Sequence, residues 1–454
     1  MLNSLRIQNF KSWKDTGDIQ FGSITGFFGT NSSGKTSILQ FLLMLKQTVE
    51  SSDRAQILNL GDERSYAELG TMHDIIHNHE SHDYIEFKIT YNSSYPVLLP
   101  AETELDGVHI GDIEFKAIIE KSDDETSLIQ FQYLLDNKSF GISQDQSTNE
   151  FYVDIHGIEM EENEHIFPNI NDPYKFYGFP NILSFYYNKG NVFNDLPSSL
   201  QMLFDKFYYL GPLRDYPKRL YTWAGEKTQG VGNRGERAIA ALLASRNHPR
   251  LSWISMGTGK VRRSLEEHIA YWLKELGLIH SFAVRPIAPN RKEYEVRIKR
   301  TAESAEVFLT DVGFGVSQLL PVLVLLFYVP EGSTIILEQP EIHLHPAVQA
   351  GLADVFIDAI KRRNVQIILE SHSEHLLQRL QLRMAEKGLN PEKEFDSTKA
   401  NLYFTSIEQG ESKLTPLQLD EYGNINNWPD GFFGDTLGEA AAMMKAEMKR
   451  KMHQ

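Results

Sequence analysis

The sequence predicts an α/β fold whose parallel sheet combines two distant parts of the chain. Segment 24–29 is apolar and strand-like, and apolar residues follow it at helical spacing over 37–49. The same alternation returns much later, in two strands and two helices: 333–339, 345–361, 364–370 and 374–387. Strands that alternate with helices form parallel sheets covered on both faces. We therefore expect one sheet built from an early and a late segment of the chain.

The composition of the 454 residues is that of an ordinary globular protein, with 41% hydrophobic and 23% charged side chains. Intrinsic disorder is excluded, and the length allows roughly three domains. The sequence has no cysteine, which excludes disulfide frameworks, cysteine-ligated metals and thiol catalysis. Because the N-terminus also lacks a signal-peptide pattern, we expect a cytoplasmic location.

The formal net charge is −16, from 45 Lys and Arg against 61 Asp and Glu, which disfavours indiscriminate binding to nucleic-acid phosphates. DNA stays open as a partner only through local basic clusters: 214–219, 260–263, 291–300, 361–363 and 445–451. The longest apolar run, Leu319–Val329, is too short to span a bilayer. No membrane is therefore expected as a partner.

The middle of the chain has a different pattern from both ends. Residues 84–209 contain alternating apolar and polar segments separated by Asn, Asp, Ser and Gly, which predicts a mostly antiparallel β insertion. Its acidic part, 121–165, is expected to be loop at least in part. Residues 236–278 have helical periodicity. Three predicted strands follow before the late segment: 282–287, 293–300 and 305–313.

The strongest motif is a glycine-rich loop between the first predicted strand and helix. It fits G-x-x-x-x-G-K-[ST], in which glycines let backbone N–H groups point at phosphates and the helix N-terminus adds its positive end. Lys35 would reach the outer phosphates, and the Thr36 hydroxyl would ligate Mg²⁺. The sequence therefore predicts a nucleoside triphosphate site with these residues: Gly29, Thr30, Asn31, Ser32, Ser33, Gly34, Lys35, Thr36 and Ser37.

Two polar residues follow the late apolar strands. Glu338 ends the strand 334–338, where a phosphate-loop protein holds its Mg²⁺, so the predicted metal ligands are Thr36 and Glu338. His372 follows the strand 364–370, where its ring could contact a γ-phosphate or the attacking water.

Glycines and a serine precede the long apolar helix of the late segment. Gly315, Ser317 and Gln318 lie at its predicted start, with Ser317 as the expected N-cap. A helix start of this kind can also receive phosphate.

Together these four pieces, in this order, resemble the nucleotide-binding domains of the ABC superfamily, in the branch that contains SMC, RecF and OLD-type ATPases. The resemblance covers about 1–75 and 205–380. It implies ATP as the nucleotide, residues 29–36 as the Walker A loop, Glu338 as the Walker B acid, 313–318 as a diverged signature motif and His372 as the switch histidine. It also implies that Lys11 and Ser12 approach the nucleotide.

The expected architecture is an ABC-type P-loop domain assembled from two chain segments, with a β-rich plus helical insertion. The first part of the ATPase domain carries Walker A, and its second part carries the signature, Walker B and the switch histidine. The predicted order is first ATPase part, β-rich insertion, helical and strand lobe, second ATPase part and C-terminal extension: 1–80, 81–205, 206–300, 301–390 and 391–454.

Within this branch the chain is similar to stand-alone AAA-type ATPases found beside phage-defence effectors in bacteria. The shared phrases are Tyr209–Arg214, 338–346 and 428–433. The resemblance implies a separately encoded effector and a role in anti-phage defence. It also implies a homo-oligomer, at least a dimer, in which Ser317 of one subunit meets the ATP on the phosphate loop of another.

One residue departs from the ABC pattern. The position after the Walker B acid is normally a glutamate that deprotonates the attacking water, and here it is Gln339. An amide can hold a water but cannot take its proton, so general-base assistance of ~10²–10⁴-fold is missing there. We expect slow hydrolysis, with Glu341 as the nearest replacement and His372 as a further contributor.

Two other functions compete with this interpretation. A DNA-repair or DNA-end-processing ATPase of the RecF/SMC type would bind duplex directly, in a salt-dependent manner. A small-molecule kinase would transfer the phosphoryl group to an acceptor, and the signature and switch segments argue against it. A built-in Toprim nuclease is disfavoured because 376–454 contain no Asp-x-Asp pair.

Three weaker features stay open. The pairs His343–His345 and His372–His375 have metal-like spacing but no further ligand. Arg214 could be an arginine finger, a partner contact or part of a structural ion pair. The basic loop 225–237 is a candidate DNA contact.

Overall fold

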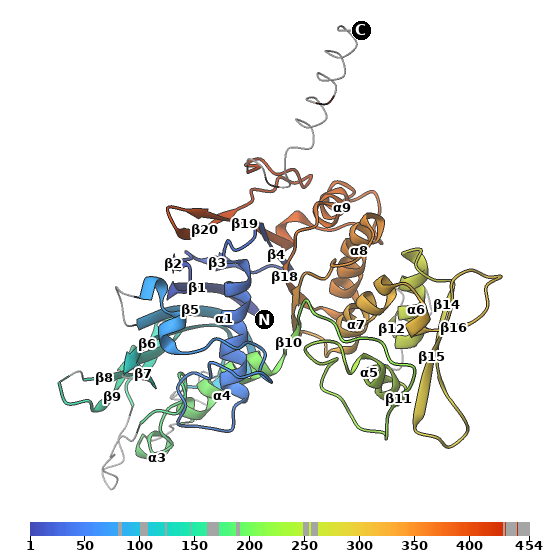
Figure 1. Ribbon diagram of the computed structural model, residues 1–454. Coiled ribbons are helices and arrows are strands. Elements are labelled where there is room, and N and C mark those ends of the chain that lie inside the picture. Colours follow the sequence, from blue (N-terminus) through green and yellow to red (C-terminus); the bar gives the residue numbers. More distant parts are fainter. Residues whose placement is uncertain are drawn as a thin grey trace.

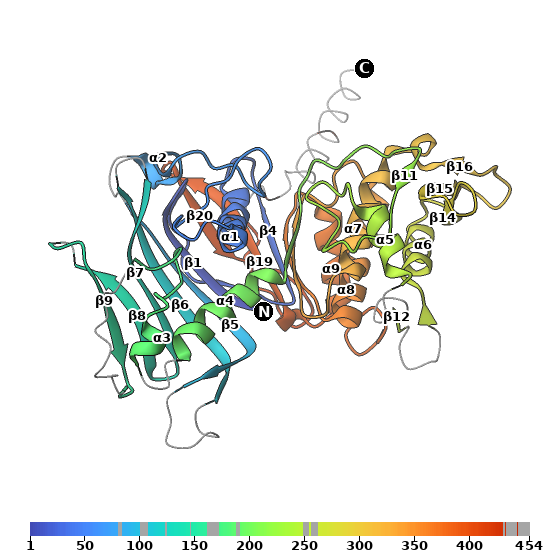
Figure 2. The ribbon, with the colours of Figure 1, turned by 90° about the horizontal axis from the view of Figure 1, so that it is seen from below.

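The computed structural model describes these parts of the chain: 1–79, 84–99, 108–122, 125–145, 147–160, 172–187, 191–247, 254–255, 262–429, 432 and 443. A strand-rich lobe and a helical lobe lie on either side of a central sheet (Figures 1 and 2). Among the described residues, no helix combines the length and apolar character that crossing a membrane requires.

The central sheet has six strands in the order β10-β17-β18-β4-β19-β20. Their bounds are Phe207–Leu210, Thr334–Glu338, Gln366–Glu370, Ile24–Gly29, Ala400–Glu408 and Glu411–Pro416. The first five run parallel, and β20 returns antiparallel to β19. The predicted α/β class and the assembly from two distant segments are therefore confirmed.

Strand β4 lies between two late strands, β18 and β19. The pairing of β4 with β19 was not predicted, because 391–454 was expected to be an extension outside the late ATPase segment. In the structure 400–416 forms two strands of the central sheet.

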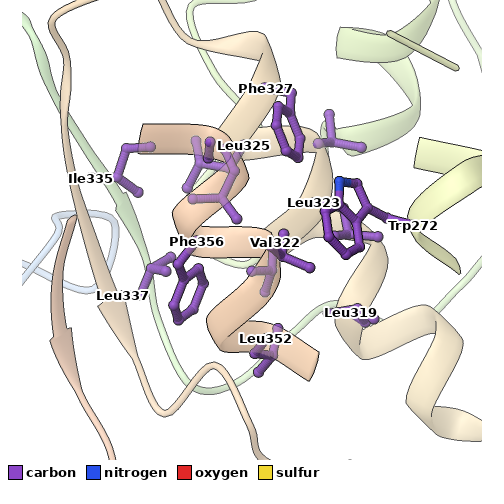
Figure 3. Packing of buried hydrophobic residues seen from close by; sticks show 14 of the residues in the cluster. Trp272, Leu319, Val322, Leu323, Leu325, Phe327, Ile335, Leu337, Leu352 and Phe356 are labelled. Atoms are coloured by element: carbon purple, nitrogen blue, oxygen red, sulfur yellow. The ribbon is translucent and has the colours of Figure 1, made fainter. Parts of the chain in front are cut away.

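The two faces of the sheet belong to different cores. Ile335 and Leu337 of β17 face the helical lobe, whereas Ile336 between them faces the strand-rich lobe. Successive side chains of a strand point to opposite faces, so a strand buried on both faces is apolar throughout. Figure 3 shows the helical side, where Ile335 and Leu337 of β17 belong to one apolar cluster with these residues: Trp272, Leu319, Val322, Leu323, Leu325, Phe327, Leu352 and Phe356.

The strand-rich lobe is an antiparallel sheet in the order β2-β1-β5-β6-β7-β8-β9, with β3 beside β1. The bounds of β1 to β3 are Leu2–Phe10, Trp13–Asp15 and Ile19–Gln20; those of β5 to β9 are Tyr84–Leu98, Val108–Ser122, Glu125–Leu135, Lys138–Gln144 and Phe151–His156. The predicted antiparallel character is confirmed. The N-terminal strands belong to the same sheet, because β1 pairs with β5.

The described residues of the acidic segment 121–165 are mostly strand, with loop in part, as expected. They contain the end of β6 and all of β7 to β9, and the irregular residues among them lie in the connections and at 157–160. Residues 161–165 lie outside the described residues.

Helices α1 (Lys35–Glu50) and α4 (Val192–Asp205) lie between the two sheets, and α2 (Met72–Ile75) and α3 (Leu183–Tyr186) are single turns. The helical lobe contains α5 to α9, with the bounds Ala238–Ser245, Leu265–Glu275, Phe314–Tyr328, Pro346–Arg363 and Glu374–Ala385. Short strands complete it: β11 (Tyr221–Thr222), β12 (Ile254–Ser255), β13 (Arg262–Arg263), β14 (Ser281–Pro286), β15 (Glu293–Lys299) and β16 (Val307–Phe308).

Two local predictions in this lobe were wrong. Helix α7 begins at Phe314, so its N-cap is Gly313 and not Ser317. The Gly313 carbonyl accepts from the Val316 N–H, and Ser317 instead donates its hydroxyl to the Phe314 carbonyl within the first turn. The predicted strand 305–313 is strand only at 307–308, because a 3₁₀ turn follows directly.

Candidate functional site

A cavity of about 420 Å³ lies where the early and late segments meet. The early segment contributes Ser12 and the loop and helix start 31–37, and the late segment contributes Gln339, Glu370 and His372. The predicted phosphate loop and switch histidine are thus brought together in one subunit. Since β4, β17 and β18 run parallel, the residues after their carboxyl ends gather at one edge of the sheet.

The phosphate loop adopts a conformation that requires its two motif glycines. Gly29 has φ 135° and Gly34 has φ 90°, in the region that favours glycine. A Cβ on Gly29 would lie 2.2 Å from the Thr405 carbonyl oxygen, and one on Gly34 would lie 2.6 Å from Ser412 Oγ. The loop is therefore packed directly against β19 and β20.

Lys35 folds back over its own loop. Its ammonium donates to the carbonyl oxygens of Gly29 (3.2 Å) and Thr30 (2.7 Å), and burial lowers the pKa of the amine. The ammonium lies beside the phosphate loop, and α1 begins at Lys35, directly after the left-handed Gly34. This combination of a helix N-terminus, a glycine-rich loop and a cation fits the phosphates of a nucleotide.

Serine and threonine hydroxyls join the loop to its surroundings. Ser33 Oγ lies 2.5 Å from Thr405 Oγ1, which in turn donates to the Phe28 carbonyl. Ser412 Oγ donates to Ser12 Oγ over 2.6 Å. Of the two N-terminal candidates, Ser12 therefore lies at the cavity, whereas Lys11 does not line it and bonds Gln40 on α1.

The carboxylate nearest to Thr36 is Glu370 and not the predicted Glu338. Thr36 Oγ1 donates to Glu370 Oε2 over 2.7 Å, and Glu370 lines the cavity. Glu338 lies one strand further from β4 and is not part of the lining. Its carboxylate accepts from the Tyr209 hydroxyl (3.0 Å), and Arg214 donates to its main-chain carbonyl (3.4 Å).

Glu370 was not among the predicted site residues, although the sequence contains a signal for it. The two late strands end in the same letters, Ile-Ile-Leu-Glu, and their acids are register partners. Burial and the neighbouring Glu370 carboxylate raise the pKa of Glu338 to about 7, and burial raises the pKa of Glu370. Carboxylate and hydroxyl oxygens are ligands that Mg²⁺ prefers, so this donor set fits the metal.

Gln339 and His372 both reach the cavity, whereas Glu341 does not line it. Gln339 has φ 42°, and its N–H donates to the Glu370 carbonyl over 2.9 Å. Glu341 is buried, and its Oε1 accepts from Ser371 Oγ (2.8 Å) and from the His372 N–H (2.7 Å). Glu341 therefore holds the switch segment in place. Burial, with a smaller effect of Lys35, lowers the pKa of His372 and favours its neutral ring.

The signature candidates lie away from this cavity. Gly315, Ser317 and Gln318 are in the first turns of α7 and do not line it. Arg214 is buried beside Glu338 and is not an exposed finger. His345 caps α8, and among the described residues no group of three His, Asp or Glu could hold a metal.

Comparison with known families supports an ATPase. Residues 1–209 match the family described as "AAA ATPase domain", and residues 231–378 match "AAA domain, putative AbiEii toxin, Type IV TA system". Residues 396–443, which include β19 and β20, match a family of proteins of unknown function. No curated protein sequence matches the chain.

Three similar solved structures are heads of SMC proteins. An SMC head bound to the C-terminal winged-helix domain of ScpA has a TM-score of 0.45 at 12% identity, with 92% of this chain and 98% of that chain covered. The Thermotoga maritima SMC head domain has a TM-score of 0.39 at 10% identity, with 92% of this chain and 99% of that chain covered. An SMC head with an extended coiled coil, bound to the C-terminal domain of ScpA from Pyrococcus furiosus, has a TM-score of 0.41 at 10% identity. The match covers 98% of this chain and 99% of that chain.

The family matches and the geometry of the cavity both point to a site for ATP. Both AAA matches fall on the segments that build the cavity, the first around the phosphate loop and the second around Gln339 and His372. Over 1–209 and 231–378 the chain is thus similar to AAA ATPase domains, and these matches support an ATPase.

Proposed function

We propose that this protein is a slowly hydrolysing ATPase that assembles around ATP and controls a separately encoded effector in anti-phage defence. The observation that carries the ATPase proposal is the cavity that joins the phosphate loop to Gln339, Glu370 and His372. The two halves of this cavity are separated by some three hundred positions of sequence, and the sheet register fixes them beside each other.

The residues of the cavity can divide the work on ATP. The loop N–H groups and Lys35 would hold the phosphates, and Thr36 with a carboxylate oxygen would hold Mg²⁺. When bound, Mg²⁺ neutralises charge that develops on the phosphate oxygens during transfer. The neutral His372 ring can hydrogen-bond the terminal phosphate or orient the attacking water.

Slow hydrolysis is proposed because the cavity has an amide where a base is needed. Gln339 can position a water, and the backbone bond to Glu370 fixes the residue at the strand end. Glu341 is a poor substitute, since its Oε1 already accepts two hydrogen bonds. An ATP-bound state that persists can act as a timer for a partner.

Assembly around ATP is proposed because the signature helix does not reach the cavity of its own subunit. Its first residue, Phe314, is 43% exposed and contacts Tyr216, which is 75% exposed. Exposed aromatic side chains beside a helix N-terminus favour a protein interface. A second copy could cover these rings and place Ser317 and Gly315 against the ATP.

The effector role is proposed from the resemblance to defence-associated ATPases. The name of one matched family, which refers to a toxin of a type IV TA system, supports it. A cytoplasmic location is proposed with it, in line with the absence of cysteine.

The test is the size of the wild-type protein and of Glu338→Gln with and without ATP and Mg²⁺, by light scattering after size exclusion. We expect ATP to shift both toward a dimer or larger assembly and an effector to co-purify. Monomers in every condition, with no companion protein, would contradict the proposal. Salt-sensitive binding of the isolated protein to duplex DNA would favour the DNA-repair alternative.

A further inference from the structure

A second and larger cavity lies beside β10, apart from the ATP site. It measures about 1220 Å³. Its walls come from the second half of α1, parts of 51–66 and 174–177, the end of α4, β10 and the loop 229–237. Figure 1 shows α1 and α4 on one side of β10 and α5, which follows this loop, on the other. Pockets for small molecules measure about 300–1,000 Å³, so the size suits a segment of a macromolecule.

The lining of this cavity is positive, although the chain has a formal net charge of −16. Five cations line it against three acids: Lys46, Arg54, Arg64, Lys175 and Arg237, and Glu50, Asp205 and Glu236. A positive cavity on an acidic protein attracts anionic groups and helps to orient them.

Two of the cations are open to a ligand. Lys46 is paired with Glu50 (2.6 Å), and Lys175 donates to two main-chain carbonyls at the end of α1. Arg64 and Arg237 are exposed, and neither forms an ion pair within 4.0 Å among the described residues. Their guanidinium groups can therefore bind carboxylates of another molecule.

Tyrosines form another part of the lining. Five of them reach the cavity: Tyr66, Tyr174, Tyr177, Tyr208 and Tyr209. The exposed Arg54 guanidinium lies over the Tyr174 ring, 4.4 Å from its centroid, which holds this arginine in place. Tyrosine and arginine are enriched in the centres of protein interfaces. This combination favours a protein as the ligand.

The acids of the lining separate a peptide from a nucleic acid. A phosphodiester backbone is negative at every nucleotide, so it would be repelled by each acid that it meets. A peptide can place a basic or polar residue opposite an acid and its own acids opposite the arginines. The mixed lining therefore favours a peptide segment in which acidic residues predominate.

Two features join this cavity to the ATP site. Helix α1 begins at the phosphate loop with Lys35, and its second half lines the cavity. Tyr209 also lines the cavity, and its hydroxyl donates to Glu338 over 3.0 Å. The Tyr209 ring meets Tyr66 edge to face, with their centroids 6.3 Å apart. A segment bound here would therefore touch elements that also shape the nucleotide site.

We propose that this cavity is the docking site for an acidic peptide segment of a partner protein, which Arg64, Arg237 and the tyrosines hold. The inference rests on the proposed control of an effector and assigns the surface where that partner binds. Because α1 and Tyr209 join the two sites, the segment and ATP are expected to change each other's affinity by the same factor.

The experiment selects peptides from a random display library on the full-length protein and measures their affinities by fluorescence polarisation. The test variant is Arg64→Glu with Arg237→Glu. The control is Arg291→Glu with Lys292→Glu, which changes the net charge equally at exposed positions outside the cavity. Binding of a fluorescent ATP analogue is measured for the wild type and both variants.

We expect the selected peptides to be rich in Asp and Glu. The test variant should bind them at least about tenfold more weakly, because both positions then repel carboxylates. The control should change their affinity by less than about twofold, since its charges lie away from the site. A saturating peptide should also change the affinity for the ATP analogue, and an unchanged value would overturn the coupling through α1 and Tyr209.

Three results would overturn the docking site. They are a selection without acidic peptides, acidic peptides that bind the test variant as well as the wild type, and an equal loss in the test and control variants. A labelled oligothymidylate is measured in parallel. If it binds in place of acidic peptides and is lost in the test variant, the cavity binds single-stranded nucleic acid and the proposal is wrong.

If the charge reversal does not fold, Arg64→Gln with Arg237→Gln takes its place. This variant removes both charges without adding acids, so weaker peptide binding supports the proposal and unchanged binding overturns it. A wild-type protein that binds the acidic peptides but not the ATP analogue would instead remove the proposed ATPase function and leave the docking site standing.

Discussion

The side chain of Gln339 is expected to limit the rate of the proposed ATP hydrolysis. It lines the cavity at a left-handed backbone position directly after β17, where its amide can hold a water but cannot take a proton. Gln339 therefore stands beside the phosphate loop, where a general base is expected, but its side chain cannot act as a base.

The first prediction is that Gln339→Glu hydrolyses ATP faster than the parent. A carboxylate at this position restores general-base assistance, so we expect a single-turnover rate at least ~10-fold higher, at the low end of the range for such assistance. Lys35→Ala serves as the control for contaminating ATPases. A Gln339→Glu rate no higher than that of the parent would show that Gln339 does not occupy the position of a missing base.

Residue-level prediction from the sequence was good where a motif fixes a local conformation. The phosphate loop, Ser12, Gln339 and His372 all meet at the cavity. It was weaker for Glu370, because which of two strand-ending acids lies beside Thr36 depends on the order of strands in the sheet. Strand order is a property of tertiary pairing, and the spacing of residues does not contain it.

Strands β19 and β20 give the phosphate loop an outer support. Thr405 contacts Ser33 of the loop, and Ser412 contacts Ser12. The segment that matches a family of unknown function therefore contacts the loop of the proposed nucleotide site.

The second prediction is that Thr405→Val weakens ATP binding, whereas Thr405→Ser does not. Valine keeps the shape of threonine but loses the hydroxyl that joins Ser33 to the Phe28 carbonyl. Loss of hydrogen bonding of about 1 kcal/mol gives a roughly fivefold weaker ATP affinity. Isothermal titration of both variants checks this. Equal affinities for valine and serine would exclude the hydroxyl as the cause.

A buried polar cluster joins α6 to α8 in the helical lobe. Asp358 accepts from Trp272 Nε1 (3.0 Å) and lies 2.9 Å from His268 Nε2, and Arg362 donates to its other oxygen. Burial raises the pKa of Asp358, but the bonds from His268, Arg362 and Trp272 outweigh it and lower the pKa overall. The ionised form is thus favoured in the folded protein.

The third prediction concerns Asp358→Asn and its dependence on pH. At pH 7 we expect a loss of about 3 kcal/mol in the free energy of unfolding, because a buried charge network is broken. A carboxyl whose pKa is lowered on folding stabilises above its unfolded value near 4, and this contribution is lost as pH falls. The gap between parent and variant should therefore shrink from pH 7 toward pH 3 in urea titrations.

Glu306→Gln is the matched control for this measurement. It breaks the exposed ion pair with Arg285 and should cost less than about 1 kcal/mol. A gap for Asp358→Asn that stays constant with pH would contradict the role of the ionised carboxylate.

Helices and strands were predicted best where the hydrophobic periodicity of the sequence is strong and no distant contact is needed to define the element. The apolar strands β4, β17 and β18 and the helix α8 lie close to their expected positions. The start of α7 was missed because Gly313 supplies the cap with a backbone carbonyl, which competes with the hydroxyl of Ser317. Strand β19 was missed because an isolated apolar segment does not reveal its distant partner β4.

At the scale of the whole molecule, the position of the signature helix is the main structural argument for assembly. Helix α7 belongs to the helical lobe (Figure 1), and its first residues do not line the cavity of their own subunit. In the proposed assembly, an intact site combines the phosphate loop of one copy with the α7 start of another.

The fourth prediction is that two inactive variants restore activity when mixed. Lys35→Ala removes the phosphate-binding cation, and Gly315→Glu places a negative charge at the α7 start. A Cβ at Gly315 would lie 3.6 Å from the Leu344 side chain, an ordinary contact, so this variant should fold. In a symmetric dimer, random mixing makes half of the dimers mixed, and each mixed dimer has one intact site out of two. The mixture should therefore reach about a quarter of the wild-type rate.

The mixture is assayed for ATP hydrolysis after co-refolding or subunit exchange. The control is each variant mixed with itself. A rate no greater than the mean of the two separate variants would mean that both residues act within the same subunit or that Gly315 is remote from the nucleotide.

The place of β4 in the sheet has a consequence for how the protein is made. Both strands that pair with β4, β18 and β19, are translated hundreds of codons after it. A nascent chain that has left the ribosome only as far as α7 carries the glycine-rich loop on a strand with two open edges, which invite wrong pairing. The proposed nucleotide site can therefore form only after β18 has been translated, and a chain that stops before β18 lacks Glu370 and His372 of the cavity.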